Sequence, residues 1–537
     1  MPTNTSSDKA VPAGYTPIVA IGGSAGGQEA VLELLGLLPA TTGFAYVYVQ
    51  HLNPDHESQL TSILGKATTM PVKKAGNLMV IEPNQVYIIP PNQEMEVTDG
   101  KLLLMPRKQA AHMPIDRFFI SLSERQKAGA IAILLSGMAT DGTFGLKAVK
   151  VAGGITIAQD ETAKYQTMPK AAIAEGVVDL ILSPRGMATE LVRLSQRTDV
   201  FRLTADAAEA NEDDELETAH EDEVPDADEP NNDQDIQTII HYIRKAIGVD
   251  FSQYKVTTIR RRIIRRMLLY QLDTLSDYIL YLQEHPTEAR VLYNDLLINV
   301  TAFFRDTEAM TYMGKVILPE LVRNLPAREP LRIWVPACST GQEAYSLAIM
   351  LLEIIGDGPY NPPIHIFATD LSEPAIIKAR QGVYTKSEVL DVSPKRLQRF
   401  FTKLDDQYRI HKTIRDLCVF APHNLFKDPP FSRIDLISCR NLLIYLDGGL
   451  QRKAFSTFHY ALKPNGFLLL GKSETVSAAP TLFTAVEKNY RVYSRRNEGS
   501  NAPFGQTSID RSSDRISAYR LQSERIDDME KKGYSPK

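Results

Sequence analysis

The chain has 537 residues, 43% of them hydrophobic and 23% charged, with a formal net charge of −5. This length exceeds what one hydrophobic core supports and predicts three or four domain-sized units of ordinary globular composition. The three cysteines form no C-x-x-C pair, which disfavours a disulfide framework and a zinc site, so we expect no metal and a reducing, cytoplasmic location. No apolar run approaches the ~18 residues that a membrane span needs, and the N-terminus has no apolar signal segment, which disfavours secretion and membrane insertion.

The first domain is predicted at residues 15–200, after a polar lead at residues 1–14 that we expect to be disordered. Short β-branched runs alternate there with helical stretches, a pattern typical of a parallel sheet covered by helices on both faces. We therefore predict a doubly wound α/β domain. The expected strands lie at residues 17–21, 44–50, 130–135, 155–158 and 178–182, and the first expected helix lies at residues 27–38.

An acidic linker is predicted at residues 201–232. Positions 206 to 235 hold fifteen Asp and Glu and no Lys or Arg, and large apolar residues are nearly absent. Such a segment cannot bury enough surface to fold, and charge repulsion extends it. A linker is the favoured interpretation, and an anionic docking strip is the alternative. Without those fifteen acids, 60 basic residues face 50 acidic ones, so the remainder of the chain is mildly basic.

An all-helical unit is predicted at residues 233–325, where isoleucines recur at helical spacing from Ile236 onward. Inside it, the segment TTIRRRIIRRM at residues 257–267 places two pairs of arginines four residues apart, on one helix face. This basic face is either solvated or a dock for an anionic protein surface, and both alternatives stay open. Nucleic acid is disfavoured as a partner, because no aromatic residues interleave the arginines to stack on bases.

A second α/β domain is predicted at residues 326–495, before a polar tail at residues 496–537 that we expect to be disordered. A strand at residues 331–335 breaks into small residues and then opens a helix, and Gly341 in this turn lets a ligand approach the backbone. The next strand ends in Asp370, a carboxylate that can accept both ribose hydroxyls of a nucleoside. The G-x-G-x-x-G pattern is missing, so a nucleoside without a pyrophosphate fits better than NAD.

The first domain carries a G-x-S-x-G motif centred on Ser24, between a predicted strand and a helix. Such a turn exposes a nucleophilic hydroxyl near a helix N-terminus, although a glycine-rich ligand loop with an incidental serine has the same pattern. His51 and Asp141 follow two other predicted strands, so the three groups meet at one sheet edge if those strands are neighbours. His56 and His112 are competing candidates for the base.

These segments resemble the successive motifs of the chemotaxis-type protein-glutamate methylesterases (CheB). The resemblance implies Ser24 as nucleophile, His51 as base, Asp141 as its orienter, and the Met138 backbone N–H as an oxyanion donor. The family usually has Arg at the position of Met113. Its members often carry an N-terminal receiver domain, for which we expect no room ahead of the first strand. The matching segments are IGGSAGG at residues 21–27, QH at 50–51, HMPID at 112–116 and SGMATDG at 136–142.

The second half resembles the CheR-type protein-glutamate methyltransferases over roughly residues 233–495, which implies S-adenosylmethionine as methyl donor. The matching segments are NVTAFFRD at residues 299–306, ACSTGQE at 337–343, ATD at 368–370, HNL at 423–425 and CRNLLIY at 439–445. The residues implied to bind the cofactor are Asn299, Thr301, Arg305, Glu343, Asp370, Asn424, Leu425, Arg440 and Asn441. Singly, Asn299 could cap a helix, Asn424 could hold a turn, and Arg440 could pair with a structural acid.

Together the two resemblances imply a bifunctional enzyme of chemotaxis or a related signalling pathway. Its second half would methylate glutamates of chemoreceptor-like helices (EC 2.1.1.80), and its first half would hydrolyse the esters (EC 3.1.1.61). Deamidation of glutamine is left open. The basic segment of the helical unit matches a part of the methyltransferase family that is thought to dock on acidic receptor helices. The alternative is a signalling scaffold whose pockets only bind partners, and a nucleic-acid methyltransferase is a third, weaker reading.

Overall fold

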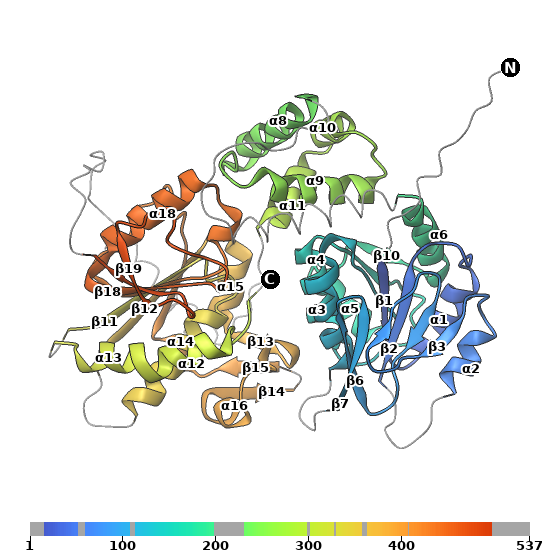
Figure 1. Ribbon diagram of the computed structural model, residues 1–537, viewed down its shortest axis with the longest axis horizontal. Coiled ribbons are helices and arrows are strands. Elements are labelled where there is room, and N and C mark those ends of the chain that lie inside the picture. Colours follow the sequence, from blue (N-terminus) through green and yellow to red (C-terminus); the bar gives the residue numbers. More distant parts are fainter. Residues whose placement is uncertain are drawn as a thin grey trace, which may run out of the picture.

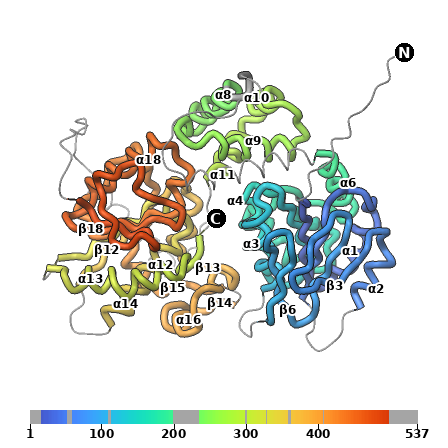
Figure 2. The backbone as a smooth tube through the Cα atoms, in the orientation of Figure 1, coloured from blue at the N-terminus to red at the C-terminus, as the bar shows by residue number. Residues whose placement is uncertain are grey.

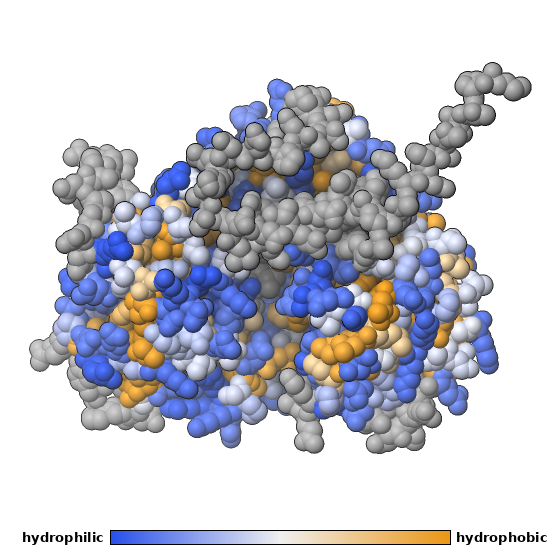
Figure 3. Space-filling model, in the orientation of Figure 1, coloured by the Kyte–Doolittle hydropathy of each residue, from blue (hydrophilic) through white to orange (hydrophobic). Residues whose placement is uncertain are grey.

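The computed structural model, shown as a ribbon in Figure 1, describes residues 16–51, 59–107, 113–197, 230–297, 301–326, 329–356, 362–405 and 407–496. The predicted lead, nearly all of the predicted linker and all but the first residue of the predicted tail lie outside the described residues. The space-filling view in Figure 3 shows a mostly hydrophilic face with small, separate apolar patches. Among the described helices, none combines the length and the apolar character that crossing a bilayer requires.

The first α/β domain is built on a seven-stranded sheet with the order β10-β9-β8-β1-β2-β5-β3. Every neighbouring pair in this sheet is parallel, which confirms the predicted architecture. The strands are β1 (Ile18–Gly23), β2 (Ala45–Gln50), β3 (Val72–Lys74), β5 (Val86–Ile88), β8 (Ile131–Leu134), β9 (Ile155–Gln159) and β10 (Leu180–Leu182).

Helices cover both faces of this sheet because successive residues of a strand point to opposite sides. Val19 and Ile21 belong to the core under α1, α2 and α6, whereas Ile18 and Ala20 belong to the core under α3, α4 and α5. The helices are α1 (Gly27–Gly36), α2 (Leu60–Gly65), α3 (Pro114–Gln126), η1 (Lys127–Gly129), α4 (Thr143–Ala152), α5 (Thr167–Ala174) and α6 (Pro184–Ser195).

A small antiparallel sheet, β4-β7-β6, packs beside α3 and was not predicted. Its strands are β4 (Met79–Val80), β6 (Gln93–Thr98) and β7 (Lys101–Pro106). Strand β6 alternates apolar and polar residues, and its Glu94 and Glu96 pair with Arg117 of α3. A two-stranded hairpin is marginal alone, so this sheet depends on the helix against which it packs.

The helical unit has a core of its own, formed by α8 to α11. Helix α8 begins three residues inside the predicted linker. The helices are α8 (Pro230–Ile247), α9 (Val256–Tyr270), α10 (Leu275–Glu284) and α11 (Pro286–Leu296). The helices that follow pack on the core of the second α/β domain: α12 (Thr307–Tyr312), η2 (Met313–Ile317) and α13 (Leu318–Arg323). The predicted boundary at residue 325 therefore lies too far along the chain, because these helices belong with the second α/β domain.

The second α/β domain contains a seven-stranded sheet with the order β16-β12-β11-β17-β18-β20-β19, of which β19 and β20 are antiparallel additions. Its strands are β11 (Leu331–Pro336), β12 (Ile364–Asp370), β16 (Cys418–Pro422), β17 (Ile434–Cys439), β18 (Leu462–Leu470), β19 (Phe483–Glu487) and β20 (Val492–Arg495). Its helices are α14 (Gln342–Ile355), α15 (Glu373–Gln381), η3 (Ser387–Val389), α16 (Pro394–Phe400), α17 (Lys412–Arg415), η4 (Leu443–Tyr445) and α18 (Gly448–Ala461). A small sheet of β13 (Val383–Thr385), β15 (Gln407–Ile410) and β14 (Phe401–Leu404) was not predicted.

The basic segment of α9 is largely buried, which corrects the expectation of a solvated or free docking face. Arg266 pairs with Glu288 inside the helical unit. Arg265 pairs with Asp295 of the same unit and with Asp179 of the first domain. The Arg262 guanidinium donates to the carbonyls that end α4. The backbone tube of Figure 2 shows α9 next to α4, and Arg262 and Arg265 join the two domains there.

Candidate active sites

The first candidate site forms at the carboxyl edge of the first sheet. Ser24 lies in the turn between β1 and α1, His51 follows β2, and Asp141 lies between β8 and α4. Strand β1 pairs with both β2 and β8 in parallel, which confirms that the three strand ends are neighbours. His56 and His112, the competing histidines, lie outside the described residues.

The three side chains form a continuous relay. The Ser24 Oγ lies 3.2 Å from His51 Nδ1, and His51 Nε2 lies 2.9 Å from Asp141 Oδ2. The His51 side chain is 28% exposed and that of Asp141 is 1% exposed, so the imidazole links a reachable hydroxyl to a buried carboxylate. Either ring nitrogen can act as a base when the other one holds its proton toward a carboxylate. This arrangement can activate a serine hydroxyl.

Backbone amides hold the Asp141 carboxylate. Ile115 N–H donates to Oδ2 at 3.1 Å, and Asp116 N–H donates to Oδ1 at 2.9 Å. Both amides belong to the first turn of α3, where unpaired N–H groups and the helix dipole favour a negative charge. The sequence motif around Pro114 was noted for its resemblance, but its role as the cradle of Asp141 emerges only from the fold.

Glycines allow the turns around Ser24 to approach one another closely. Gly26 has φ 73°, a conformation that residues with a Cβ rarely adopt. A Cβ on Gly137 would lie 3.0 Å from the Cβ of Ser24, and Ser24 N–H donates to Ser136 O. The Gly137–Met138 turn therefore lies against Ser24, next to the N-terminus of α1. The Met138 side chain is 56% exposed at this rim.

The second candidate site is a cavity at the carboxyl edge of the second sheet, roofed by the helical unit. Among the predicted cofactor residues it is lined by Thr301, Arg305, Glu343, Asp370, Leu425, Arg440 and Asn441. The other lining residues include Tyr254, Thr258, Ile259, Leu296, Ser339, Thr369, His423, Phe426 and Tyr445. Sequence reasoning did not single out the helical unit's residues, because they follow an ordinary helical pattern.

Asp370 and the loop after β11 shape the floor of this cavity. The Asp370 carboxylate accepts from Ser339 N–H and Ser372 N–H, each at 2.8 Å, and burial raises the pKa of the carboxyl. Gly341, which precedes α14, has φ 92°, and Ala337 and Ser339 also have positive φ. Strained backbone of this kind clusters at ligand sites. The buried Ser339 Oγ has no hydrogen-bond partner among the described residues, and as a cavity-lining group it can bind a polar ligand.

Arg440 lies at the other end of the cavity, with its side chain only 1% exposed. Its guanidinium pairs with Asp306, lies 3.7 Å from Glu343, and donates to the Arg305 carbonyl at 2.8 Å. Burial raises the pKa of Glu343 and the Arg440 charge opposes that rise. The reading of Arg440 as a partner of a structural acid is thus correct, and Arg440 also lines the cavity.

One predicted cofactor residue lies away from the cavity, and another cannot be placed. The Asn424 side chain accepts from Phe426 N–H and Lys427 N–H, so it holds a turn, and it is not among the residues that line the cavity. Asn299 lies outside the described residues. One residue that the sequence did not reveal is Glu474, whose buried carboxylate accepts from the backbone of the loop that carries Arg440.

Within the described ranges, no three His, Cys, Asp or Glu side chains gather as ligands for an ion. Of the acids that line the second cavity, Asp370 accepts from backbone N–H groups, and Glu343 accepts from the Ser438 hydroxyl and lies 3.7 Å from Arg440. The donor set of this cavity, a carboxylate beside small residues and apolar walls, fits a nucleoside.

Family comparisons match the three domains in chain order. Residues 19–191 match the family described as CheB methylesterase, residues 234–297 match the all-alpha domain of CheR methyltransferase, and residues 299–492 match its S-adenosylmethionine-binding domain. An uncharacterized 104.1 kDa protein of Rhodobacter capsulatus is 34% identical over 82% of this chain, which spans about half (47%) of that protein.

Relatives of each half are also found. The chemotaxis protein methyltransferase of Listeria innocua is 32% identical and matches 46% of this chain over 92% of its own length. The crystal structure of the CheB methylesterase catalytic domain of Thermotoga maritima is 32% identical, covers 34% of this chain and 99% of that one, and gives a TM-score of 0.32. The chain therefore belongs to the chemotaxis protein methyltransferase family, with a CheB-type methylesterase domain ahead of the methyltransferase and S-adenosylmethionine as its cofactor.

Proposed function

We propose that this chain adds methyl esters to glutamate side chains of a chemoreceptor-like protein and also hydrolyses them. The observation that carries the proposal is the relay from Ser24 through His51 to Asp141, in the same chain as a separate cavity lined by Asp370 and small and apolar residues. A scaffold without activity would not need the 2.9 Å contact between a half-buried imidazole and a buried carboxylate.

The methylesterase domain would act through an acyl-enzyme. His51 takes the proton of Ser24 as Oγ attacks the ester carbonyl, and Asp141 stabilises the imidazolium. Negative charge on the carbonyl oxygen is stabilised by the Met138 backbone N–H and by the N-terminus of α1. The proton then passes from His51 to the departing methanol. Water attacks the acyl-enzyme with His51 as base and releases a glutamate. The same steps on glutamine would release ammonia.

The methyltransferase half would act mainly by positioning. S-adenosylmethionine supplies a methyl group that its sulfonium already activates. Asp370 would bind the ribose hydroxyls, and Arg305 or Arg440 would hold a carboxylate by charge-assisted hydrogen bonds. The glutamate needs no general base because it reacts in its ionised form, so alignment supplies most of the rate. Tyr445, at the cavity wall, would donate a hydrogen bond.

Transfer of labelled methyl groups tests this proposal. The purified chain is incubated with methyl-labelled S-adenosylmethionine and either a membrane fraction that contains chemoreceptors or total RNA. The expected result is base-labile label on protein, followed by release of labelled methanol. Asp370→Ala should abolish transfer, and Ser24→Ala should abolish release from ester that has already formed.

Each contrary result has a distinct meaning. Label on RNA would favour a nucleic-acid methyltransferase. Absence of transfer and of release, with the cofactor still bound, would favour a scaffold. Methanol release that persists in Ser24→Ala would reject the assigned nucleophile.

A further inference from the structure

A second carboxyl lies directly behind the relay. Asp116, in the first turn of α3, is 0% exposed. Its own N–H donates to Asp141, and its Oδ1 accepts from Gly145 N–H of α4 at 2.7 Å. Asp116 thus joins the start of α3, which cradles the Asp141 carboxylate, to the start of α4, which follows Asp141 in the chain. Substrate cannot touch this group, but it can set where Asp141 lies.

The other oxygen of Asp116 is unusual. Asp116 Oδ2 is buried and has no hydrogen-bond partner among the described residues. Burial and the neighbouring Asp141 carboxylate raise the pKa of Asp116 well above its usual range. Two adjacent buried carboxyls do not readily both ionise, and Asp141 already has backbone donors and an imidazole for its charge. The neutral acid is the favoured form of Asp116, and a neutral acid has an O–H that needs an acceptor.

The methyltransferase domain brings a matching group to this place. Ser387, the first residue of η3, is buried, and its Oγ also lacks a hydrogen-bond partner among the described residues. Its hydroxyl lies close enough to Asp116 to interact with the carboxyl. It tends to lower the pKa of Asp116, but burial and the Asp141 carboxylate outweigh this effect. Buried polar groups without partners are rare in proteins, and here two of them, one from each half, are neighbours.

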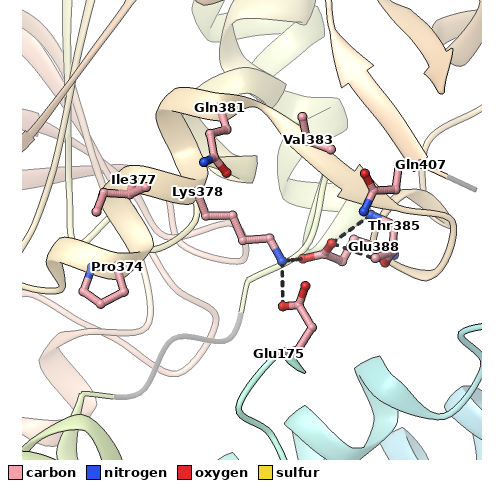
Figure 4. A pocket seen from close by; sticks show the side chains of 9 residues that line it. All are labelled: Glu175, Pro374, Ile377, Lys378, Gln381, Val383, Thr385, Glu388 and Gln407. Carbon is pink, nitrogen blue, oxygen red and sulfur yellow. Dashed lines mark hydrogen bonds and ion pairs between the residues drawn. The ribbon is translucent and has the colours of Figure 1, made fainter. Parts of the chain in front are cut away.

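Ion pairs hold η3 in this position. Glu388, next to Ser387, pairs with Lys378 of α15 at 2.8 Å, and Lys378 pairs with Glu175 of the methylesterase domain at 3.2 Å. Figure 4 shows the Lys378 ammonium between the two carboxylates, with Glu388 beside Thr385. Burial would lower the pKa of Lys378, but the two acids raise it, so the lysine stays charged. Ion pairs of Lys378 therefore hold η3 to α15 and hold α15 to the methylesterase domain.

We propose that Asp116 and Ser387 are positioning residues for the methylesterase reaction, through which the methyltransferase half fixes the Asp141 carboxylate behind His51. The inference rests on the proposed Ser24–His51–Asp141 relay. Neutral Asp116 donates its O–H to Ser387 Oγ and accepts from Gly145, which locks the starts of α3 and α4 together. Hydrolysis then depends on contact with the other catalytic domain, although no residue of that domain touches the ester.

A positioning role predicts a specific pattern of kinetic effects. Asp116→Ala removes both hydrogen bonds and frees Asp141 to shift, and a displacement of about 1 Å can cost on the order of 10²-fold in rate. Asp116→Asn keeps an acceptor at one side and an N–H donor at the other, so it imitates the neutral acid. Ser387→Ala removes one hydrogen bond, worth about 1 kcal/mol or roughly fivefold. The change should appear in kcat and not in KM, because neither residue contacts substrate.

The experiment uses the full chain and hydrolysis of p-nitrophenyl acetate as a small ester probe. We expect kcat to fall about 30- to 100-fold in Asp116→Ala and about fivefold in Ser387→Ala, and to stay within about threefold of the parent in Asp116→Asn. KM should not change. Ser456→Ala, on the exposed face of α18, is the matched control and should leave hydrolysis unchanged. Methyl transfer and the thermal midpoint, measured on each preparation, report whether the chain is folded.

The outcomes separate this inference from the proposed function. Ser24→Ala should abolish hydrolysis; if it does not, the relay itself is wrong. With the relay intact, parent-like kcat in a folded Asp116→Ala rejects the positioning role of Asp116. Parent-like kcat in Ser387→Ala rejects the link between the domains. If Asp116→Ala does not fold, a large loss of kcat in folded Asp116→Asn rejects the neutral acid and overturns the inference.

Discussion

The two candidate sites of this chain are assembled in different ways. The candidate methylesterase site draws its three candidate catalytic groups from one domain, at the ends of three adjacent strands, and His51 contacts both Ser24 and Asp141. The methyltransferase cavity draws its lining from the helical unit, from the segment before α12 and from the loops of the second sheet. Its charged residues mostly hold one another or the backbone. A serine hydroxyl must be activated by neighbouring side chains before it can attack an ester, whereas a sulfonium methyl donor is already activated and mainly needs a shaped wall that aligns it.

The largest expected effect is on the directly connected site. Ser24→Ala should lower methanol release by at least about 10⁴-fold, because loss of a nucleophile removes the acyl-enzyme route. Methyl transfer by the same preparation should be unchanged. Ser183→Ala, which removes an N-cap of α6 in the same domain, is the matched control. A loss of less than tenfold would mean that a different group attacks the ester, and the contrast between the sites would fail.

The contact between the domains gives the next largest effect. Arg265→Ala removes the arginine that pairs with both Asp179 and Asp295, and breaking such a buried pair costs about 3–5 kcal/mol. Lys150 and Arg266 remain near the two acids, so we expect the lower end of this range. Denaturant unfolding followed by circular dichroism measures the loss. Lys245→Ala, on the exposed surface of the helical unit, should cost under about 0.5 kcal/mol. A cost below 1 kcal/mol for Arg265→Ala would show that this ion pair does not hold the two domains together.

Acid should weaken the same contact. Burial alone would raise the pKa of Asp179, but the charges of Arg265 and Lys150 lower it to about 2. A folded-state pKa below the unfolded value of about 3.9 gives stability that is present above pH 4 and is lost as the pH falls through 2. The difference corresponds to about 2.5 kcal/mol. The stability gap between the parent and Asp179→Asn should therefore narrow between pH 4 and pH 2, and a constant gap would contradict the assigned pair.

Cofactor binding should respond less sharply to a single change. Asp370→Asn keeps the shape of the side chain but removes its charge, and hydrogen bonds to a charged group are worth about 1.5–3 kcal/mol. The Kd for S-adenosylmethionine should rise about 30-fold by calorimetry. Glu373→Gln, on the exposed first turn of α15, should leave the Kd unchanged. Equal affinity of the Asp370 variant and the parent would place the ribose elsewhere.

The smallest expected effect concerns the wall of the cavity. Burial raises the pKa of Tyr445, so its hydroxyl stays protonated and can donate. Tyr445→Phe removes one hydrogen bond, which predicts a loss of about fivefold in methyl transfer. Phenylalanine preserves the packing, so the Kd for the cofactor should not change. An unchanged transfer rate would show that the tyrosine only packs.

The two halves are in direct contact, whereas the predicted linker suggested only a tether between them. A tether alone raises the effective concentration of two activities without fixing their geometry. In the structure, Arg262 of α9 donates to a carbonyl in the last turn of α4, and Arg265 of α9 pairs with Asp179. Lys378 pairs with Glu175. A receptor that is to use the basic face of α9 would have to displace the methylesterase domain. The sequence showed the spacing of the arginines, but it did not show that the methylesterase domain covers them.

Local sequence patterns predicted much of the fold. Alternating apolar runs and helical spacing predicted both parallel sheets, because burial on two faces demands continuous apolar strands. Short or weakly apolar strands such as β4 and β13 were missed, since their stability comes from the helices and strands beside them. The helices from Thr307 to Arg323 were assigned to the helical unit, because sequence periodicity shows that a helix buries a face but not which core receives it.

By itself the sequence determined where the candidate groups lie along the chain: a serine in a glycine turn, a histidine and an aspartate after strands, and an acid at the end of β12. These groups can be found from the sequence alone, because a strand end and the turn after it consist of consecutive residues. Only the tertiary structure decided that Asn424 holds a turn, that the α9 arginines are buried, and that Asp116 lies behind Asp141 and beside Ser387. Burial and the identity of a neighbour are properties of how distant segments pack, and no single segment contains them.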